Sequence, residues 1–177
     1  MSRSAGITVF SALYFASVFI SCGESANSGS HHFHSPVEYH DFIVDQQNVI
    51  IRQMLKLNEL YDSGSEKAIR ERFDSLRASS KVCLTNINNL SAYEADSTLQ
   101  KDALALFTFY DAVFSKEYAR MLQIFLKGEQ ASEAEVIELN AIVESVGLKE
   151  KDLQDKLIQS QSRFASEHQF EFSADGE

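Results

Sequence analysis

The stretch EKAIRERFDSLRASSKVCLTNINNL, residues 66–90, carries the most regular apolar pattern in the chain. Its apolar and small side chains recur at steps that alternate between four and three residues, which is the spacing of one face of an α-helix. A helix with a single apolar face buries that face against another element, so the stretch predicts one member of a helical bundle. The face consists of Ile69, Phe73, Leu76, Ser80, Cys83, Ile87 and Leu90.

Three further stretches share this spacing, and we expect helices over residues 36–62, 64–90, 97–127 and 133–168. Each helix opens with a serine that is followed three residues later by Glu or Gln. In this capping-box pattern the two side chains satisfy backbone N–H groups of the first turn. Gly128 follows the third stretch and is expected to end that helix. The four boxes are Ser35–Glu38, Ser63–Glu66, Ser97–Gln100, with Asp96 as an alternative cap, and Ser132–Glu135.

The links between the helices indicate how they are arranged. Short links join the first helix to the second and the third to the fourth, which makes each pair antiparallel. We therefore predict an all-α fold, an up-down-up-down four-helix bundle over residues 35–170, followed by a loose tail over residues 171–177. The helix pairs do not repeat with a fixed period, which argues against a repeat protein.

Residues 1–21 differ in character from the rest of the chain. Arg3 precedes an uncharged apolar run from Ile7 to Ile20, which is shorter than the roughly 20 residues of a membrane span and suits the core of a signal peptide. The pair Ser21-Cys22 follows, and it resembles the end of a lipobox, in which a small residue precedes the cysteine whose thiol accepts lipid. We predict a cleaved lipoprotein signal peptide over residues 1–21 and lipidation of Cys22.

Two other interpretations of this leader stay open. One is a signal anchor that is not cleaved. The other is ordinary signal cleavage near Ala26, which the charge of Glu24 disfavours because that position suits a small residue.

Residues 22–34 are predicted to be a flexible tether, because they are rich in Gly, Ser and Asn and contain little to bury. The tether includes His31, His32 and His34. Three imidazoles are able to attract zinc or copper, but a flexible segment offers no fixed geometry, so we expect only weak, adventitious metal binding.

The composition limits the choice of partners. A formal net charge of −10 repels nucleic acid and anionic lipid headgroups, so we predict no nucleic-acid partner. Besides Cys22, the chain has Cys83 as its second cysteine. Cys83 lies on the apolar face described above, which is typical of a small packing residue rather than of a reactive thiol.

Polar residues interrupt the apolar faces at a few positions. Gln46 and Gln53 lie on the face of the first helix, and Glu117 and Arg120 on that of the third. Three interpretations are open: these residues form a polar site inside the bundle, they fix the register between helices, or they lie at the solvent-exposed edge of the helix contact. Phe109 lies outside the apolar face of the third helix, where an aromatic ring favours contact with a partner.

Signatures of catalysis and of cofactor binding are absent from the sequence. A di-iron bundle needs Glu-x-x-His on two helices, and this chain has no such motif. Neither a Ser-His-Asp or Cys-His arrangement nor a phosphate-binding loop is recognisable. We therefore predict no enzyme activity, no cofactor and no metal in the bundle core.

With the Cys22 lipobox and four capped helices together, the chain resembles bacterial surface lipoproteins of unassigned role that are built as helical bundles. Residues 107–114 (FTFYDAVF) and residues 161–165 (QSRFA) add to the likeness. The resemblance implies a lipid anchor in the cell membrane or outer membrane, facing the periplasm or the cell exterior, and implies no catalytic residue or ligand.

We accordingly expect a monomeric, lipid-anchored protein of the cell envelope. Its membrane contact is the lipid at Cys22, and its role is that of a non-catalytic protein-interaction or structural module that meets an envelope or extracellular protein. The alternative is a binder of a small apolar ligand within the bundle.

Overall fold

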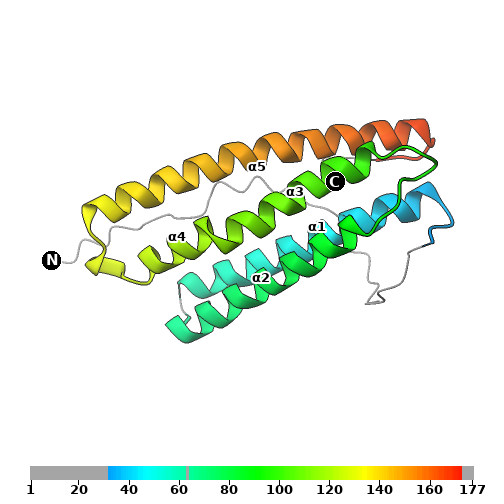
Figure 1. Cartoon of the computed structure of the whole chain (residues 1–177). Helices are drawn as coiled ribbons and strands as arrows, with labels where there is room; N and C mark the ends of the chain where they lie inside the picture. The colour runs from blue at the N-terminus through cyan, green and yellow to red at the C-terminus, as the bar shows by residue number, and fades with distance from the viewer. Residues whose placement is uncertain (1–31, 63, 173–177) are drawn as a thin grey trace.

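The computed structural model describes residues 32–62 and 64–172 and confirms an all-α fold (Figure 1). In these residues the only β-type pairing is an isolated bridge between Tyr93 and Asp96. Within the same ranges, none of the helices combines the length and the apolar character that crossing a bilayer requires. The elements are α1 (Pro36–Tyr61), α2 (Glu66–Asn88), α3 (Thr98–Ser115), α4 (Glu117–Phe125), the 3₁₀ turn η1 (Gly128–Gln130) and α5 (Glu133–Glu167).

The helices form an up-down-up-down four-helix bundle in which α3 and α4 together make the third rod (Figure 1). α1 packs on α2, α2 packs on α3, and α5 lies along both α3 and α4. α1 and α5 contact each other far less than these neighbours do. The third rod therefore separates α5 from the hairpin of α1 and α2 over most of the bundle.

The prediction of one continuous helix over residues 97–127 was wrong in two respects. Lys116 has φ −125° and ψ −69°, which are not helical values, and this residue separates α3 from α4. α4 then ends at Phe125, before the expected end. Gly128 lies in η1 with φ +53°, in the left-handed region that favours glycine, so it does turn the chain as expected. Neither glycine nor proline lies near Lys116, so the break has no local signal in the sequence.

Two of the four predicted serines cap their helices, and one of them forms the complete predicted box. Ser132 and Glu135 make the complete capping box at the start of α5, with each side chain accepting a hydrogen bond from the other residue's backbone N–H. Ser35 caps α1 by accepting from the N–H of Glu38 at 3.1 Å, while the Glu38 carboxylate accepts from the N–H of His34 at 2.7 Å.

The other two caps differ from the prediction. α2 is capped by Ser65, whose hydroxyl accepts from the N–H of Ala68 at 3.2 Å, whereas Ser63 lies outside the described residues. Ser97 precedes α3 but its side chain makes no capping hydrogen bond. Asp96, the alternative cap, accepts from the N–H of Thr98 at 2.8 Å. An aspartate carboxylate is the stronger acceptor, and it takes the position that Ser97 was expected to fill.

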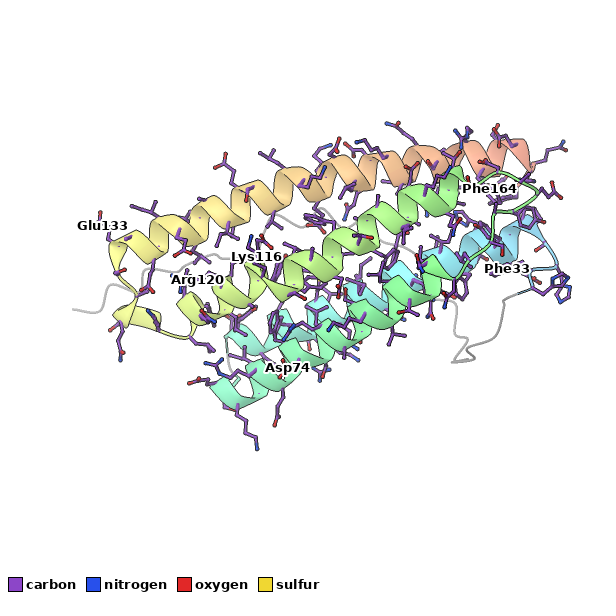
Figure 2. All side chains as sticks on the ribbon, viewed as in Figure 1. Phe33, Asp74, Lys116, Arg120, Glu133 and Phe164 are labelled. Atoms are coloured by element: carbon purple, nitrogen blue, oxygen red, sulfur yellow. The ribbon has the colours of Figure 1, made fainter. Side chains whose placement is uncertain are left out.

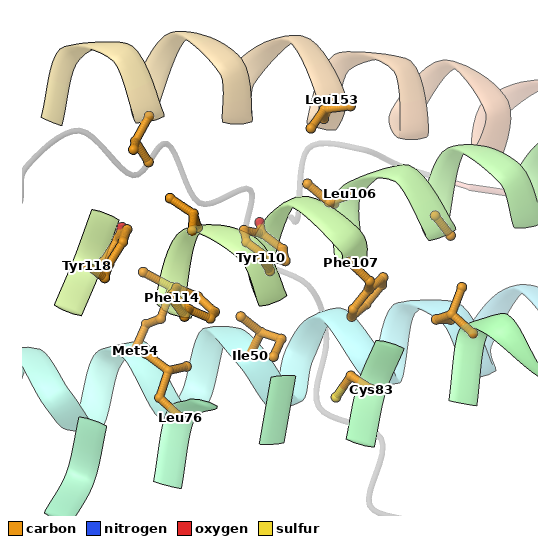
Figure 3. Packing of buried hydrophobic residues seen from close by; sticks show 14 of the residues in the cluster. Ile50, Met54, Leu76, Cys83, Leu106, Phe107, Tyr110, Phe114, Tyr118 and Leu153 are labelled. Carbon is orange, nitrogen blue, oxygen red and sulfur yellow. The ribbon is translucent and has the colours of Figure 1, made fainter. Parts of the chain in front are cut away.

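One continuous core runs through the bundle, and Figure 3 shows side chains from α1, α2, α3 and α5 meeting in it. Ile43, Leu76, Leu106 and Leu157, one from each rod, are each 0% exposed. The apolar face predicted for residues 66–90 is buried at every one of its positions, whereas Val136, at the start of the predicted face of the last helix, is 37% exposed. Cys83, on the face of residues 66–90, is 2% exposed, as expected of a packing residue.

Aromatic rings close the end of the bundle at which α1 begins and α5 ends. The ring of Tyr39 lies 5.1 Å from that of Phe33 and 5.7 Å from that of Phe164, and Figure 2 shows Phe33 and Phe164 at this end. Beyond α5, the rings of Phe170 and Phe172 pack edge-on against His40. The packed body therefore includes Phe33, near the end of the predicted tether, and Phe172, in the predicted loose tail.

The difference between the two serines that precede α3 and α5 gives a direct test of the capping geometry. Ser132→Ala is expected to lower the free energy of unfolding by about 1 kcal/mol, because the N–H groups at the start of α5 lose an acceptor. Ser97→Ala is expected to change it by less than about 0.5 kcal/mol, because Ser97 caps nothing. Chemical denaturation of the two variants measures both values, and equal losses would contradict the assignment of the caps.

Candidate functional site

The four polar residues predicted on the apolar faces do not form a common site. Gln46 is buried in the contact of α1 with α2, where its side-chain oxygen accepts a hydrogen bond from the amide of Asn86 at 2.9 Å. Gln53 accepts from the guanidinium of Arg72 at 3.4 Å in the same helix pair. Both glutamines therefore join α1 to α2, which fits register control rather than a ligand site.

Arg120 joins α4 to α5. Its guanidinium donates to both carboxylate oxygens of Glu138, at 2.9 and 2.6 Å, and lies 3.5 Å from Glu135. The hydrogen bond to Glu138 is the main cause that raises the pKa of Arg120. Glu135 also pairs with Lys127. The hydrogen bond from Lys127, followed by the one from the backbone N–H of Ser132, lowers the pKa of Glu135 to about 2. Because a paired guanidinium fork fixes orientation as well as distance, this cluster orients α4 on α5.

A buried polar cluster lies between α3 and α5. The hydroxyl of Tyr110 donates to the carboxylate of Glu150 at 3.0 Å, and the amide of Gln154 donates to Tyr110 at 3.2 Å and to Glu150 at 3.3 Å. Glu150 is 5% exposed, and in the described residues it has no ion-pair partner. Burial raises the pKa of Glu150 to about 7, against the smaller opposing effect of the Tyr110 hydrogen bond. The α3–α5 contact therefore contains a carboxyl group that changes charge near neutral pH.

Sequence reasoning did not find this cluster. A signal was present, because Glu150 lies four residues after Val146 and three before Leu153, on the buried face of α5. A single acidic residue at such a position is most often at a solvated edge, and only the pairing of α3 with α5 brings Tyr110 to it. Figure 3 shows Tyr110 on α3 with its hydroxyl toward α5.

A cavity of about 260 Å³, open to solvent beside the exposed Ala112 and Ser145, lies along the same contact of α3 and α5, toward the break at Lys116. Val113, one turn from Tyr110, and Val146, one turn from Glu150, form part of its wall. Pockets for drug-sized ligands are usually about 300–1,000 Å³, so this cavity suits a smaller molecule. Its lining consists of Phe109, Ala112, Val113, Glu117, Ser145 and Val146.

The cavity accounts for two residues that the sequence singled out. Phe109, predicted outside the apolar face of its helix, is half-buried and lines the cavity. Glu117, predicted on that face, is the ionisable group in the lining, and its carboxylate lies 3.5 Å from the ammonium of the exposed Lys116. Glu117 and Arg120 therefore have separate surroundings, and neither contacts Gln46 or Gln53.

The remaining candidates from the sequence lie elsewhere. Cys22 and His31 lie outside the described residues, and His32 and His34 are exposed at the start of the described chain. Residues 32–62 and 64–172 contain no group of His, Cys, Asp and Glu side chains arranged to hold a metal ion. Burial raises the pKa of the Cys83 thiol to about 12, which keeps it protonated and unreactive.

His40 is a buried polar residue that sequence reasoning placed in a helix without assigning it a role. It is 5% exposed, its Nδ1 lies 3.1 Å from the carboxylate of Asp41, and its Nε2 has no hydrogen-bond partner in the described part of the chain. Burial lowers the pKa of His40, and the contact with Asp41 opposes that effect. A neutral imidazole covered by Phe170 and Phe172 serves as part of the aromatic closure of this end.

Comparisons of this chain with protein-family models, with curated proteins and with solved structures found no match. The resemblance to bacterial surface lipoproteins therefore rests on the sequence features quoted above.

Replacing Glu150 tests the buried carboxyl group. Because the folded pKa is about 7 and the ordinary value is 4.5, the unfolded chain releases this proton at a lower pH than the folded chain does. The stability that Glu150 provides is complete below about pH 4.5 and falls by about 1.4 kcal/mol per pH unit until about pH 7. Glu150→Gln lacks this titration. Its free energy of unfolding should therefore rise relative to that of the unsubstituted protein by on the order of 3 kcal/mol between about pH 4.5 and about pH 7.

Chemical denaturation of both proteins from about pH 4 to about pH 8 measures this difference. Glu144→Gln, on the exposed side of α5, is the control and should follow the original protein at every pH. Parallel stability curves for Glu150→Gln and the original protein would show that Glu150 titrates normally.

Proposed function

We propose that this chain is a lipid-anchored protein of the bacterial cell envelope, in which the helical bundle serves as a non-catalytic protein-interaction or structural module. The observation that carries the proposal is the order of features at the N-terminus: Arg3, an uncharged apolar run, and then Ser21-Cys22. A multiply acylated cysteine holds a protein at a bilayer without a membrane-spanning helix, because each buried CH₂ contributes roughly 0.8 kcal/mol.

The position of the described chain fits such an anchor. His32 lies at the aromatic end of the bundle, next to Phe33. The residues from Cys22 to His32 reach at most about 35 Å when fully extended. Lipid at Cys22 would therefore hold the aromatic end within about 35 Å of the membrane.

The outer side of α5 supports a role in protein contact. Ile137 and Leu148 are 63% and 67% exposed. They lie eleven residues apart, which is close to three helical turns, so they share one side of the helix. That side is opposite Leu139 and Val146, which are buried on the third rod. We therefore place the proposed contact with another envelope protein on this side of α5.

The surroundings of the chemically active side chains support a non-catalytic role. Cys83 is held protonated in the core, and Tyr110 and Glu150 are buried in the pairing of α3 with α5. Groups placed in this way stabilise and specify helix contacts rather than face a substrate.

A second candidate function is the binding of a small ligand within the bundle. The cavity between α3 and α5 favours it, because Phe109, Val113 and Val146 provide apolar walls.

The lipid anchor predicts a specific labelling pattern in a bacterial host. Radiolabelled palmitate should be incorporated into the original chain and into Cys83→Ser, but not into Cys22→Ser, because Cys22 supplies the thiol that accepts lipid. The anchored forms should fractionate with membranes. Absence of label from the original chain, or label retained in Cys22→Ser, would rule out the proposed anchor.

A partner on the outer side of α5 predicts position-dependent crosslinking. A photo-reactive amino acid at position 137 or 148 should give an adduct of one defined mass in intact cells. The matched control is position 82 on α2, because Val82 is also well exposed, at 59%. The same adduct from all three positions, or from none, would contradict a partner site on α5.

A further inference from the structure

We propose that the cavity between α3 and α5 is a binding site for a small organic cation, with a primary ammonium group and a compact apolar body. This inference goes beyond the anchoring role, and it refines the second candidate function by assigning a charge to the ligand. It does not depend on lipidation of Cys22, so a failure of the anchor and a failure of this site are distinguishable.

The lining of the cavity combines the three features that such a ligand needs. Ala112, Val113 and Val146 form aliphatic walls, Phe109 adds an aromatic ring, and Glu117 supplies a carboxylate. An ammonium group is attracted both to a carboxylate and to the face of an aromatic ring, and the attraction grows where water is partly excluded. Walls of this kind offer few oxygen ligands, so a bare metal ion is a poorer fit than an organic cation.

The ionisable group in the lining of the cavity is an acid, and the one cation recorded beside it, the ammonium of Lys116 at 3.5 Å, belongs to an exposed side chain. Glu117 is the ionisable residue of the lining, and Glu150 lies one helical turn beyond the Val146 wall. The chain as a whole has a formal net charge of −10, which attracts cations to its surface. A neutral or anionic ligand would gain nothing from this field.

The existing partner of Glu117 is easily displaced. Lys116 lies 3.5 Å from the Glu117 carboxylate, but its side chain is 85% exposed, whereas that of Glu117 is 32% exposed. An exposed ion pair contributes little, typically below about 1 kcal/mol. A ligand ammonium that enters from the cavity therefore competes with a weak contact and leaves Lys116 in water.

The helix break lies next to the site. Glu117 is the first residue of α4, directly after Lys116, where the chain leaves helical geometry. Glu117 follows Val113 by four residues, and the two still line the same wall of the cavity across the break.

Isothermal titration calorimetry on the full chain in a mild non-ionic detergent, with a micelle blank, tests the site. The probe is phenethylammonium and the matched neutral probe is 2-phenylethanol, which has the same ring and chain without the charge. We expect phenethylammonium to bind at least about tenfold more tightly than 2-phenylethanol. We expect Glu117→Gln to weaken phenethylammonium binding by at least about tenfold, the effect of losing roughly 1.4 kcal/mol.

Two further variants define the location. Ala112→Phe fills the cavity from an exposed position on α3 and should abolish binding, while Glu144→Gln, an exposed change beside Ser145 that does not alter the lining, should leave it unchanged. Circular dichroism checks that every variant is folded. Equal binding of the charged and neutral probes, no effect of Glu117→Gln, binding that survives Ala112→Phe, or no binding of phenethylammonium would each overturn the proposal.

Discussion

The bundle depends on the burial of α3 on two sides. α3 packs against α2 on one side and against α5 on the other, whereas α1 and α5 contact each other much less. Its buried residues lie on more than one face, as shown by Leu106 and Phe107, which are adjacent in sequence and both 0% exposed. Because α1 and α5 have little direct contact, most of the apolar surface that α5 buries lies against the third rod.

Polar contacts then specify which helix faces which. Gln46 with Asn86 joins α1 to α2, Tyr110 with Glu150 joins α3 to α5, and Arg120 with Glu138 joins α4 to α5. Apolar packing is tolerant of sliding, whereas a buried hydrogen bond is lost when the register changes and leaves an unsatisfied group. The contact made by Glu150 is specific but pH-sensitive, because its carboxyl group is buried without a cation.

The parts of the structure that follow from local sequence were predictable. The helical spacing of apolar residues identified the buried faces, and the Ser132–Glu135 box fixed the start of α5, because both depend on residues within a few positions of one another. At the start of α3 two side chains were available as the N-cap. The capping-box pattern favoured Ser97, but Asp96 caps the helix.

The candidate site depends on residues far apart in the chain and was largely beyond prediction. Tyr110 meets Glu150 across forty residues, and the cavity joins Glu117 to Val146. Sequence spacing placed Glu117 on a helix face, but it gave no information on the break at Lys116. Glu117 nevertheless lies beside Val113, as the helical spacing predicted, and what the sequence did not indicate is that Val146 of α5 faces both residues.

Native-state hydrogen exchange tests most directly whether α3 is the element that the rest of the bundle depends on. If it is, the amides of α3 from Leu106 to Tyr110 exchange only through global unfolding, and α5 is never protected when α3 is open. Faster exchange in α3 than in α1 and α2, or protection of α5 that outlasts that of α3, would contradict the account.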